Sequence, residues 1–167
     1  MSVPVPTLAF PSTRHDSDSR GAARFARWAP IPLRLIVGLG FIEHGVLKLQ
    51  RGPEVFAAAL QALGTPFPHF AAWATIATEL LGGLAILVGA FVWLASVPLA
   101  VVMLTAIATV HWQFGFSSVK LLAVTAAGPQ FGKPGYEVAV LYLACLLALV
   151  VGGPGPWSVD DLRDQLK

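Results

Sequence analysis

The chain has 167 residues, of which 56 % are hydrophobic and only 12 % charged, and its mean hydropathy is +0.71. Soluble domains carry about 25 % charged residues, so this composition is typical of a membrane protein. A single cysteine, Cys145, excludes a disulfide scaffold and dithiol redox chemistry. The net charge of +2, without a long basic patch, argues against nucleic-acid binding.

The charged residues gather at the two ends of the chain. Of 20 Asp, Glu, Lys and Arg residues, 6 lie within residues 1–29 and 5 within residues 153–167. Residues 80–119 form a stretch of 40 without any of them. A span needs only ~20 residues to cross a ~30 Å hydrocarbon core, so this stretch predicts two spans that fold back on each other.

Residues 1–29 are predicted to be a polar, basic tail on the cytoplasmic side. They do not fit a cleaved signal, because the mildly apolar residues 1–10 follow no positive region. Arg20, Arg24 and Arg27 are spaced as one helical face, which suits anionic lipid headgroups. A solvated, disordered tail fits this composition equally well.

The first predicted span covers residues 31–49, with Pro30 and Pro32 where a helix can begin. Residues 50–68 are too polar and too rich in proline to cross the membrane. Within them, residues 53–63 place their apolar side chains on one helical side. We therefore expect a short helix lying flat at the interface.

The second span is predicted over residues 68–89, and a very short turn leads to a third span that ends near residue 114. Pro98 lies in the early turns of the third span, where a membrane helix tolerates it. Residues 115–134 contain two lysines, three glycines and two prolines, which favours a loop that dips into the interface.

The fourth span is predicted over residues 135–151. A segment rich in glycine and proline ends it, and Ser158 with Asp161 resembles a capping box for a short terminal helix. The expected fold is all-α: a membrane-embedded four-helix bundle over residues 30–152, with a short interfacial helix between helices 1 and 2. Residues 153–167 are a short C-terminal tail.

Four spans place both termini on one side of the membrane. Six Lys and Arg residues fall on that side and four on the other, which favours cytoplasmic termini. The same topology gathers six ionisable side chains from four helices in the non-cytoplasmic half: Glu43, His44, Lys48, Glu79, His111 and Glu137. Arg34 is the exception, near the opposite edge.

An ionised group at mid-membrane costs at least ~2.5 to 3.5 kcal/mol, so six of them need pairing, water or a ligand. One interpretation is a polar pocket in which His44, Glu79 and His111 exchange protons or bind a polar ligand head. The other is a set of interhelical ion pairs, such as Lys48 with Glu137, and Glu43 or Glu79 with a histidine. Both interpretations stay open at this point.

Helical rotation divides the charges of the first span. At ~100° per residue His44 and Lys48 lie about 40° apart, so they are the expected inward pair, and Glu43 faces a neighbouring helix. On the second span Glu79 shares its face with Gly82 and Gly83, which predicts close helix contact and a buried carboxylate.

Tyr142, in the fourth span, is interpreted as structural and not as a ligand-binding residue. No metal or intrinsic cofactor is predicted, because the spacings His-x-x-x-His, Glu-x-x-His and Cys-x-x-Cys-His do not occur.

Five short motifs, in order along the four spans, resemble the DoxX family. They are Gly-Phe-Ile-Glu-His-Gly-Val-Leu-Lys at residues 40–48, Glu-Leu-Leu-Gly-Gly at 79–83, His111, Tyr-Glu at 136–137, and Gly-Pro-Gly-Pro-Trp-Ser-Val-Asp at 153–160. The resemblance covers roughly residues 31–161.

The resemblance implies a multi-pass protein of the bacterial inner membrane. The family includes small subunits of quinone-linked oxidase or thiosulfate:quinone oxidoreductase complexes. It thus implies quinone as a ligand, other subunits of a redox complex as partners, and Glu43, His44, Glu79, His111 and Glu137 as head-group or proton-handling residues. Whether the chain itself catalyses a reaction stays open. The alternatives are a non-catalytic scaffold or assembly subunit and, ranked last, a small-solute transporter.

Overall fold

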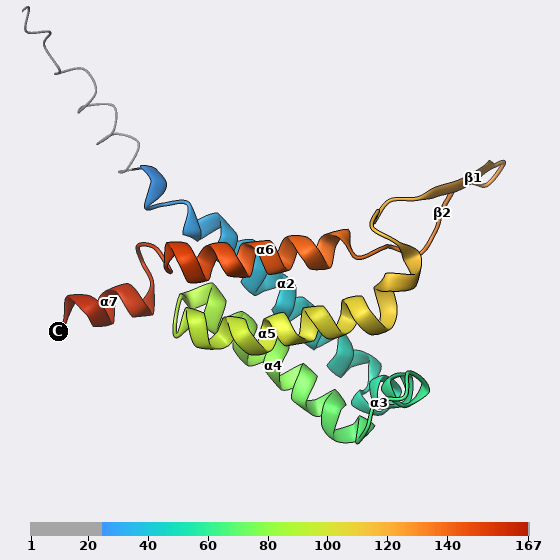
Figure 1. Ribbon diagram of the computed structural model, residues 1–167, viewed down its shortest axis with the longest axis horizontal. Coiled ribbons are helices and arrows are strands. Elements are labelled where there is room, and N and C mark those ends of the chain that lie inside the picture. The colour runs from blue at the N-terminus through green and yellow to red at the C-terminus, as the bar shows by residue number, and fades with distance from the viewer. Residues whose placement is uncertain (1–24, 167) are drawn as a thin grey trace, which may run out of the picture.

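The computed structural model describes residues 25–166, and its centre is a bundle of four helices (Figure 1). They are α2 (Pro30–Arg51), α4 (Pro68–Val88), α5 (Val92–Ala106) and α6 (Glu137–Gly152). Prolines begin α2 and α4, where a missing N–H costs no helical hydrogen bond. The predicted tail over residues 1–29, with Arg20 and Arg24, lies outside the described residues except for 25–29.

Within residues 25–166, three helices are long and apolar enough to cross a membrane. They are α2 with 22 residues, α4 with 21, and a helix of 23 residues in which α5 continues through η1 (Ile107–His111) and η2 (Trp112–Phe114). The fourth helix, α6, is apolar but has only 16 residues, or about 24 Å at ~1.5 Å per residue. It packs against α2 and α5 and returns the chain to the end where α2 begins (Figure 1).

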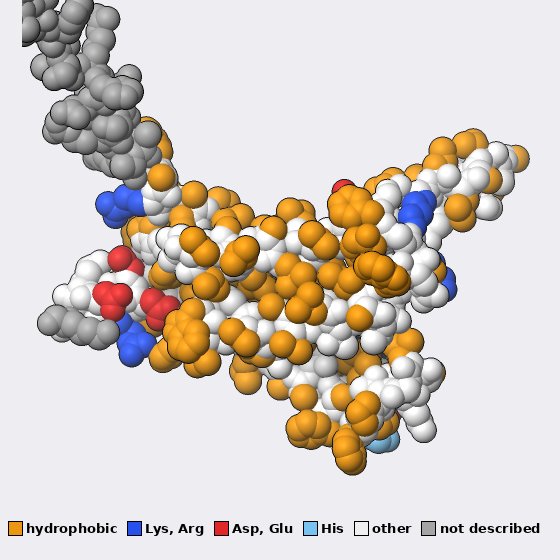
Figure 2. All heavy atoms as spheres, in the orientation of Figure 1, with side chains coloured by type: hydrophobic (Ala, Val, Ile, Leu, Met, Phe, Trp, Pro, Cys, Tyr) orange, Lys and Arg blue, Asp and Glu red, His pale blue; other side chains and the backbone are white. Residues whose placement is uncertain are grey.

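The outer faces of these helices carry large exposed hydrophobic side chains, including Leu39 on α2, Leu81 on α4 and Leu147 on α6. Figure 2 shows apolar side chains over the middle of the visible face, with charged side chains toward its two ends. Such a surface requires lipid around it, so the predicted membrane-embedded helical bundle is confirmed.

Glycines set how closely α2 and α4 approach. A Cβ atom on Gly38 would lie 2.8 Å from the carbonyl oxygen of Gly83, and one on Gly83 would lie 2.9 Å from that of Gly38. Neither residue can therefore carry a side chain without moving a backbone, and the two helices pack along small residues as membrane helices often do. The close contact predicted for Gly82 and Gly83 is confirmed, with Gly82 facing Leu99 of α5.

The buried core joins all four helices. It contains Val37 and Phe41 from α2, Ile86 from α4, Leu99 from α5 and Leu146 from α6, each at most 2 % exposed. The short helix predicted between the first two spans is also confirmed: α3 (Pro53–Ala62) lies between α2 and α4 in the chain and packs mainly on α4.

Two local features were not predicted. Residues 115–134, expected to be a loop, contain an antiparallel hairpin of β1 (Leu121–Thr125) and β2 (Gly128–Phe131), in which Thr125 pairs with Gly128. Gly128 has φ +111°, a conformation that favours glycine. The second feature is the π-helical turn η1, which interrupts a span expected to be uniformly α-helical.

The C-terminal segment closes one end of the bundle. Its short helix α7 (Val159–Gln165) begins after Ser158, whose Oγ accepts a hydrogen bond from the Asp161 backbone N–H, so the predicted capping interaction is confirmed. The Asp160 carboxylate accepts hydrogen bonds from the backbone N–H groups of Phe91 and Val92, at the start of α5.

Arg34 of α2 completes this closed end. Its guanidinium, 6 % exposed, donates to the carbonyl oxygens of Leu87, Pro154, Pro156 and Trp157 at 2.8 to 3.4 Å. Leu87 lies in the last turn of α4, where carbonyls lack helical donors. The isolated arginine of the sequence therefore joins two helices to the C-terminal segment.

Candidate functional site

A cleft of about 970 Å³ lies in the half of the bundle opposite the Arg34 end. It forms because α4 and α5, joined by a tight turn after Val88, diverge as they leave that turn (Figure 1). Residues of α2, α3 and α4 line one side, and residues of α5, η1 and α6 line the other. Most of the lining is apolar, and its polar residues are His44, Lys48, Thr75, Thr78, Glu79, Thr105, Thr109, His111, Ser118 and Tyr142.

The Lys48 ammonium and the Glu79 carboxylate form the strongest polar contact in the cleft. Lys48 Nζ donates to Glu79 Oε1 at 2.8 Å and to Oε2 at 2.6 Å. Glu79 is 2 % exposed and the Lys48 side chain 23 %, so the pair lies at the base of the cleft wall. The buried carboxylate predicted for Glu79 is confirmed.

This pair follows from the close packing of α2 on α4. Gly45, one turn before Lys48, lets the side chain of Leu80 approach within 2.8 Å of where a Cβ would lie. The helices therefore lie close enough for a lysine on one to meet a carboxylate 31 residues away on the other. Lys48 pairs with Glu79, and Glu137 instead accepts from the Ser118 backbone N–H, so the alternative pairs considered from the sequence, Lys48 with Glu137 and Glu79 with a histidine, are not formed among the described residues.

His44 lies one helical turn before Lys48 and lines the same cleft. Its ring centroid is 6.4 Å from that of Tyr142, and Tyr142 also contacts Phe41 edge to face at 5.2 Å. The Tyr142 hydroxyl lies against the backbone at Gly40, where any Cβ would collide with it. Gly40 thus makes room for a phenol hydroxyl beside His44.

His111 reaches the cleft from the opposite side. Its Nδ1 lies 3.2 Å from the carbonyl oxygen of Pro134, in the segment before α6. His111 ends the π-helical turn η1, and such turns insert an extra residue that re-aims the side chains after it, often at functional sites. The hydroxyl groups of Thr105 and Thr109, on the same wall, donate hydrogen bonds to backbone carbonyls one turn earlier.

Ser118 and Glu137 meet at the edge of the cleft. The Ser118 backbone N–H donates to Glu137 Oε2 at 2.9 Å. The Ser118 hydroxyl lines the cleft, is buried, and has no hydrogen-bond partner among residues 25–166. Buried hydroxyls are usually satisfied, so this one has capacity left for a ligand or a water molecule.

Four of the six predicted site residues therefore line one cleft: His44, Lys48, Glu79 and His111. Glu43 is exposed and does not line it, and Glu137 instead fixes the backbone of Ser118.

Sequence reasoning missed Tyr142 and Ser118 as cleft residues. Val138, Ala139 and Tyr142 share a helical face that lines the cleft, but their side-chain types resemble those of a packing face. Ser118 lies in a segment without periodicity, so the sequence carries no signal for it.

The cleft combines two imidazoles, a neutralised ion pair and several hydroxyls with apolar walls. Imidazoles accept and donate protons near neutral pH, and apolar walls strengthen each polar contact by excluding water. Within residues 25–166, no group of three or more His, Cys, Asp or Glu side chains is arranged to hold a metal ion.

Fold and site together define a helical membrane protein with a ligand-sized, mostly apolar cleft in one half of its bundle. The chain belongs to the DoxX family, whose model matches residues 29–112. The matched range contains His44, Lys48, Glu79 and His111, and it ends before the hairpin and α6.

The chain is also similar to a protein from Mycobacterium tuberculosis that is described as a membrane protein. The chain is 30 % identical over 137 residues, covering 78 % of each protein, to a protein described as "Uncharacterized membrane protein Rv3486". No solved structure matches the chain.

Proposed function

We propose that this protein is a subunit associated with a quinone-linked redox complex of the bacterial cytoplasmic membrane, and that its cleft receives a quinone head or passes protons. The carrying observation is the cleft itself: His44 and His111 face it from opposite walls within an apolar lining. A quinone head presents carbonyl oxygens that accept hydrogen bonds, and the His44 imidazole, the Tyr142 phenol and the Ser118 hydroxyl are donors of that kind.

The electrostatics of the cleft suit a neutral head. Lys48 and Glu79 neutralise each other at 2.6 Å, so a neutral ligand enters without facing an isolated charge. The unpaired Ser118 hydroxyl supports a ligand or water at the far wall. We further propose that both termini are cytoplasmic, as the excess of Lys and Arg on their side favours. The cleft then lies in the non-cytoplasmic half.

The test is native mass spectrometry of the protein released from its own membranes in mild detergent. We expect a retained quinone mass, and we expect His44→Ala to reduce its occupancy at least about ten-fold through loss of a polar contact worth ~1.5 kcal/mol. His69→Ala is the matched control, because His69 is exposed and pairs with Glu54 outside the cleft. Equal quinone retention by His44→Ala and His69→Ala would contradict the proposal.

The second candidate function is a non-catalytic scaffold or assembly subunit. The Lys48–Glu79 pair favours it, since two groups that satisfy each other can fix helix packing without any ligand. The same mass spectra separate the two functions: a chain that retains other subunits but no small molecule supports the scaffold. A small-solute transporter ranks below both, because Arg34 and the C-terminal segment fill the opposite end of the bundle.

A further inference from the structure

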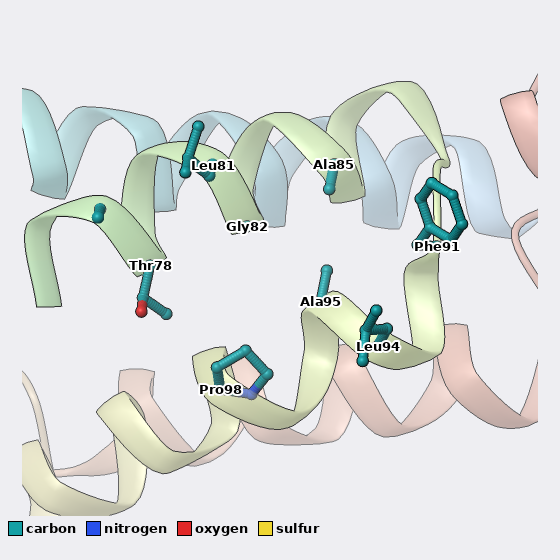
Figure 3. A pocket seen from close by; sticks show the side chains of 9 residues that line it. Thr78, Leu81, Gly82, Ala85, Phe91, Leu94, Ala95 and Pro98 are labelled. Carbon is teal, nitrogen blue, oxygen red and sulfur yellow. The ribbon is translucent and has the colours of Figure 1, made fainter. Parts of the chain in front are cut away.

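A second hollow lies on the lipid side of α4 and α5. It is a groove of about 370 Å³ between the two helices, on the side of the cleft toward their connecting turn. Figure 3 shows Ala85 of α4 and Ala95 of α5 pointing toward each other across it. Because alanines and a glycine line much of it, the helices leave an open channel where larger side chains would close it.

The groove adjoins the cleft. Thr78 of α4 and Pro98 of α5 line both hollows, and Figure 3 shows them at one end of the groove. From Thr78 to Ala85 the groove follows α4 for about 10 Å at ~1.5 Å per residue. The polar groups of the cleft and the apolar groove therefore lie next to each other, with Thr78 and Pro98 at their boundary.

The lining changes from partly polar in the cleft to apolar in the groove. The cleft presents two imidazoles, an ion pair and hydroxyls, whereas beyond Thr78 the groove walls are formed by aliphatic side chains and Phe91. A ligand that fills both hollows must carry a polar head and one narrow hydrocarbon chain. The polar end lies by His44 and His111, and the chain runs toward the turn between α4 and α5.

We propose that the α4–α5 groove is a tail site, which holds the first part of the hydrocarbon chain of the molecule whose head occupies the cleft. This inference rests on the proposed function and adds to it. The cleft selects a single-chain amphiphile, such as a quinone with an isoprenoid tail, over a tailless ring. Thr78 and Pro98 line both hollows, and this shared lining assigns the groove to the molecule in the cleft instead of to bulk lipid.

The test compares two quinones in lipid nanodiscs: one with a long isoprenoid tail and one with the same ring and no tail. Ala85→Phe fills the groove, and Ala148→Phe, on the exposed face of α6, is the matched control. In the unchanged protein and in Ala148→Phe we expect the long-tailed quinone to bind at least about ten-fold more tightly at equal concentration in the bilayer, since its tail gains van der Waals contacts with the groove walls. Ala85→Phe removes this advantage and leaves binding of the tailless ring unchanged.

The outcomes separate the tail site from the head site. If Ala85→Phe keeps the tail advantage, bulk lipid occupies the groove and the tail site is wrong, while the proposed function stands. If neither quinone binds the unchanged protein, both proposals fall. Ala77→Phe, also in the groove wall, repeats the test should Ala85→Phe fail to fold.

Discussion

The two ends of the bundle use their charged residues in opposite ways. At the closed end Arg34 makes five hydrogen bonds to four fixed carbonyls and is 6 % exposed. At the open end His44 and His111 line a cleft of about 970 Å³, where the Ser118 hydroxyl has no partner among the described residues. A charged residue within a membrane span therefore indicates a ligand site only where a cavity adjoins it and bonding capacity remains.

Arg34 shows why the closed end needs a cation. The C-terminal segment carries prolines, which have no N–H to form regular structure, and its carbonyls turn inward. A guanidinium offers five donors in a fixed plane, so one side chain satisfies several buried carbonyls at once. At the closed end the Arg34 charge therefore stabilises the packing. Removing this side chain tests the comparison with the open end.

The largest effect is expected from Arg34→Met. Four buried carbonyls lose their donor, so the free energy of unfolding should fall by about 3–5 kcal/mol. The measurement is unfolding by sodium dodecyl sulfate from mild-detergent micelles. Arg51→Met, an exposed arginine at the other end of α2, is the control and should change it by less than about 0.5 kcal/mol. Similar losses of unfolding free energy in both variants would contradict this stabilising role of Arg34.

The next largest effect is expected from Lys48→Met, which leaves the Glu79 carboxylate unpaired at 2 % exposure. We expect a loss of about 2–3 kcal/mol, because an unpaired buried charge is the costly state. The double variant Lys48→Met with Glu79→Leu should recover most of that loss. A double-mutant cycle with no coupling would show that the pair does not stabilise the α2–α4 contact.

Asp160→Ala should have a smaller effect. The Asp160 carboxylate caps the first two N–H groups of α5, and removal of such a cap costs about 1 kcal/mol. Asp161→Ala serves as the control, since its side chain contacts only the exposed Gln165 amide in the same helix. Thermal unfolding of the two variants in one detergent compares them directly, and equal midpoints would be inconsistent with this cap.

The smallest effect on stability is expected at the open end. His44 is exposed in the cleft, so His44→Ala should change the free energy of unfolding by less than about 0.5 kcal/mol while it lowers quinone retention. The same detergent titration and mass spectra measure both. A large loss of stability would make His44 a packing residue like Arg34, and the contrast between the two ends would disappear.

Much of the architecture was predictable because its signals are local. Hydropathy and proline positions place α2, α4 and α6, and Ser158 marks the start of α7. The Glu79 carboxylate was expected to be buried because glycines share its face. The hairpin within residues 115–134 was not expected, since its strands are exposed except at the half-buried Gly128 and show no alternation of buried and exposed residues.

Which charged residues pair across the helices was not predictable, because the pairing depends on the axial offset of one helix relative to the next. The contact of Gly38 with Gly83 sets that offset for α2 and α4, and Lys48 then meets Glu79 instead of Glu137. Four of the six predicted site residues meet in the cleft, because topology alone placed them at similar depth. Tyr142 and Ser118 came only with the three-dimensional arrangement.

The sequence by itself determined a membrane-embedded four-helix protein with six ionisable residues in one half and Arg34 in the other, because hydropathy and helical period act on each segment separately. Only the tertiary structure decided which charges are satisfied and which line a cavity. The reason is that glycine contacts, the π-helical turn before Trp112 and the Arg34 clamp join residues as many as 123 positions apart.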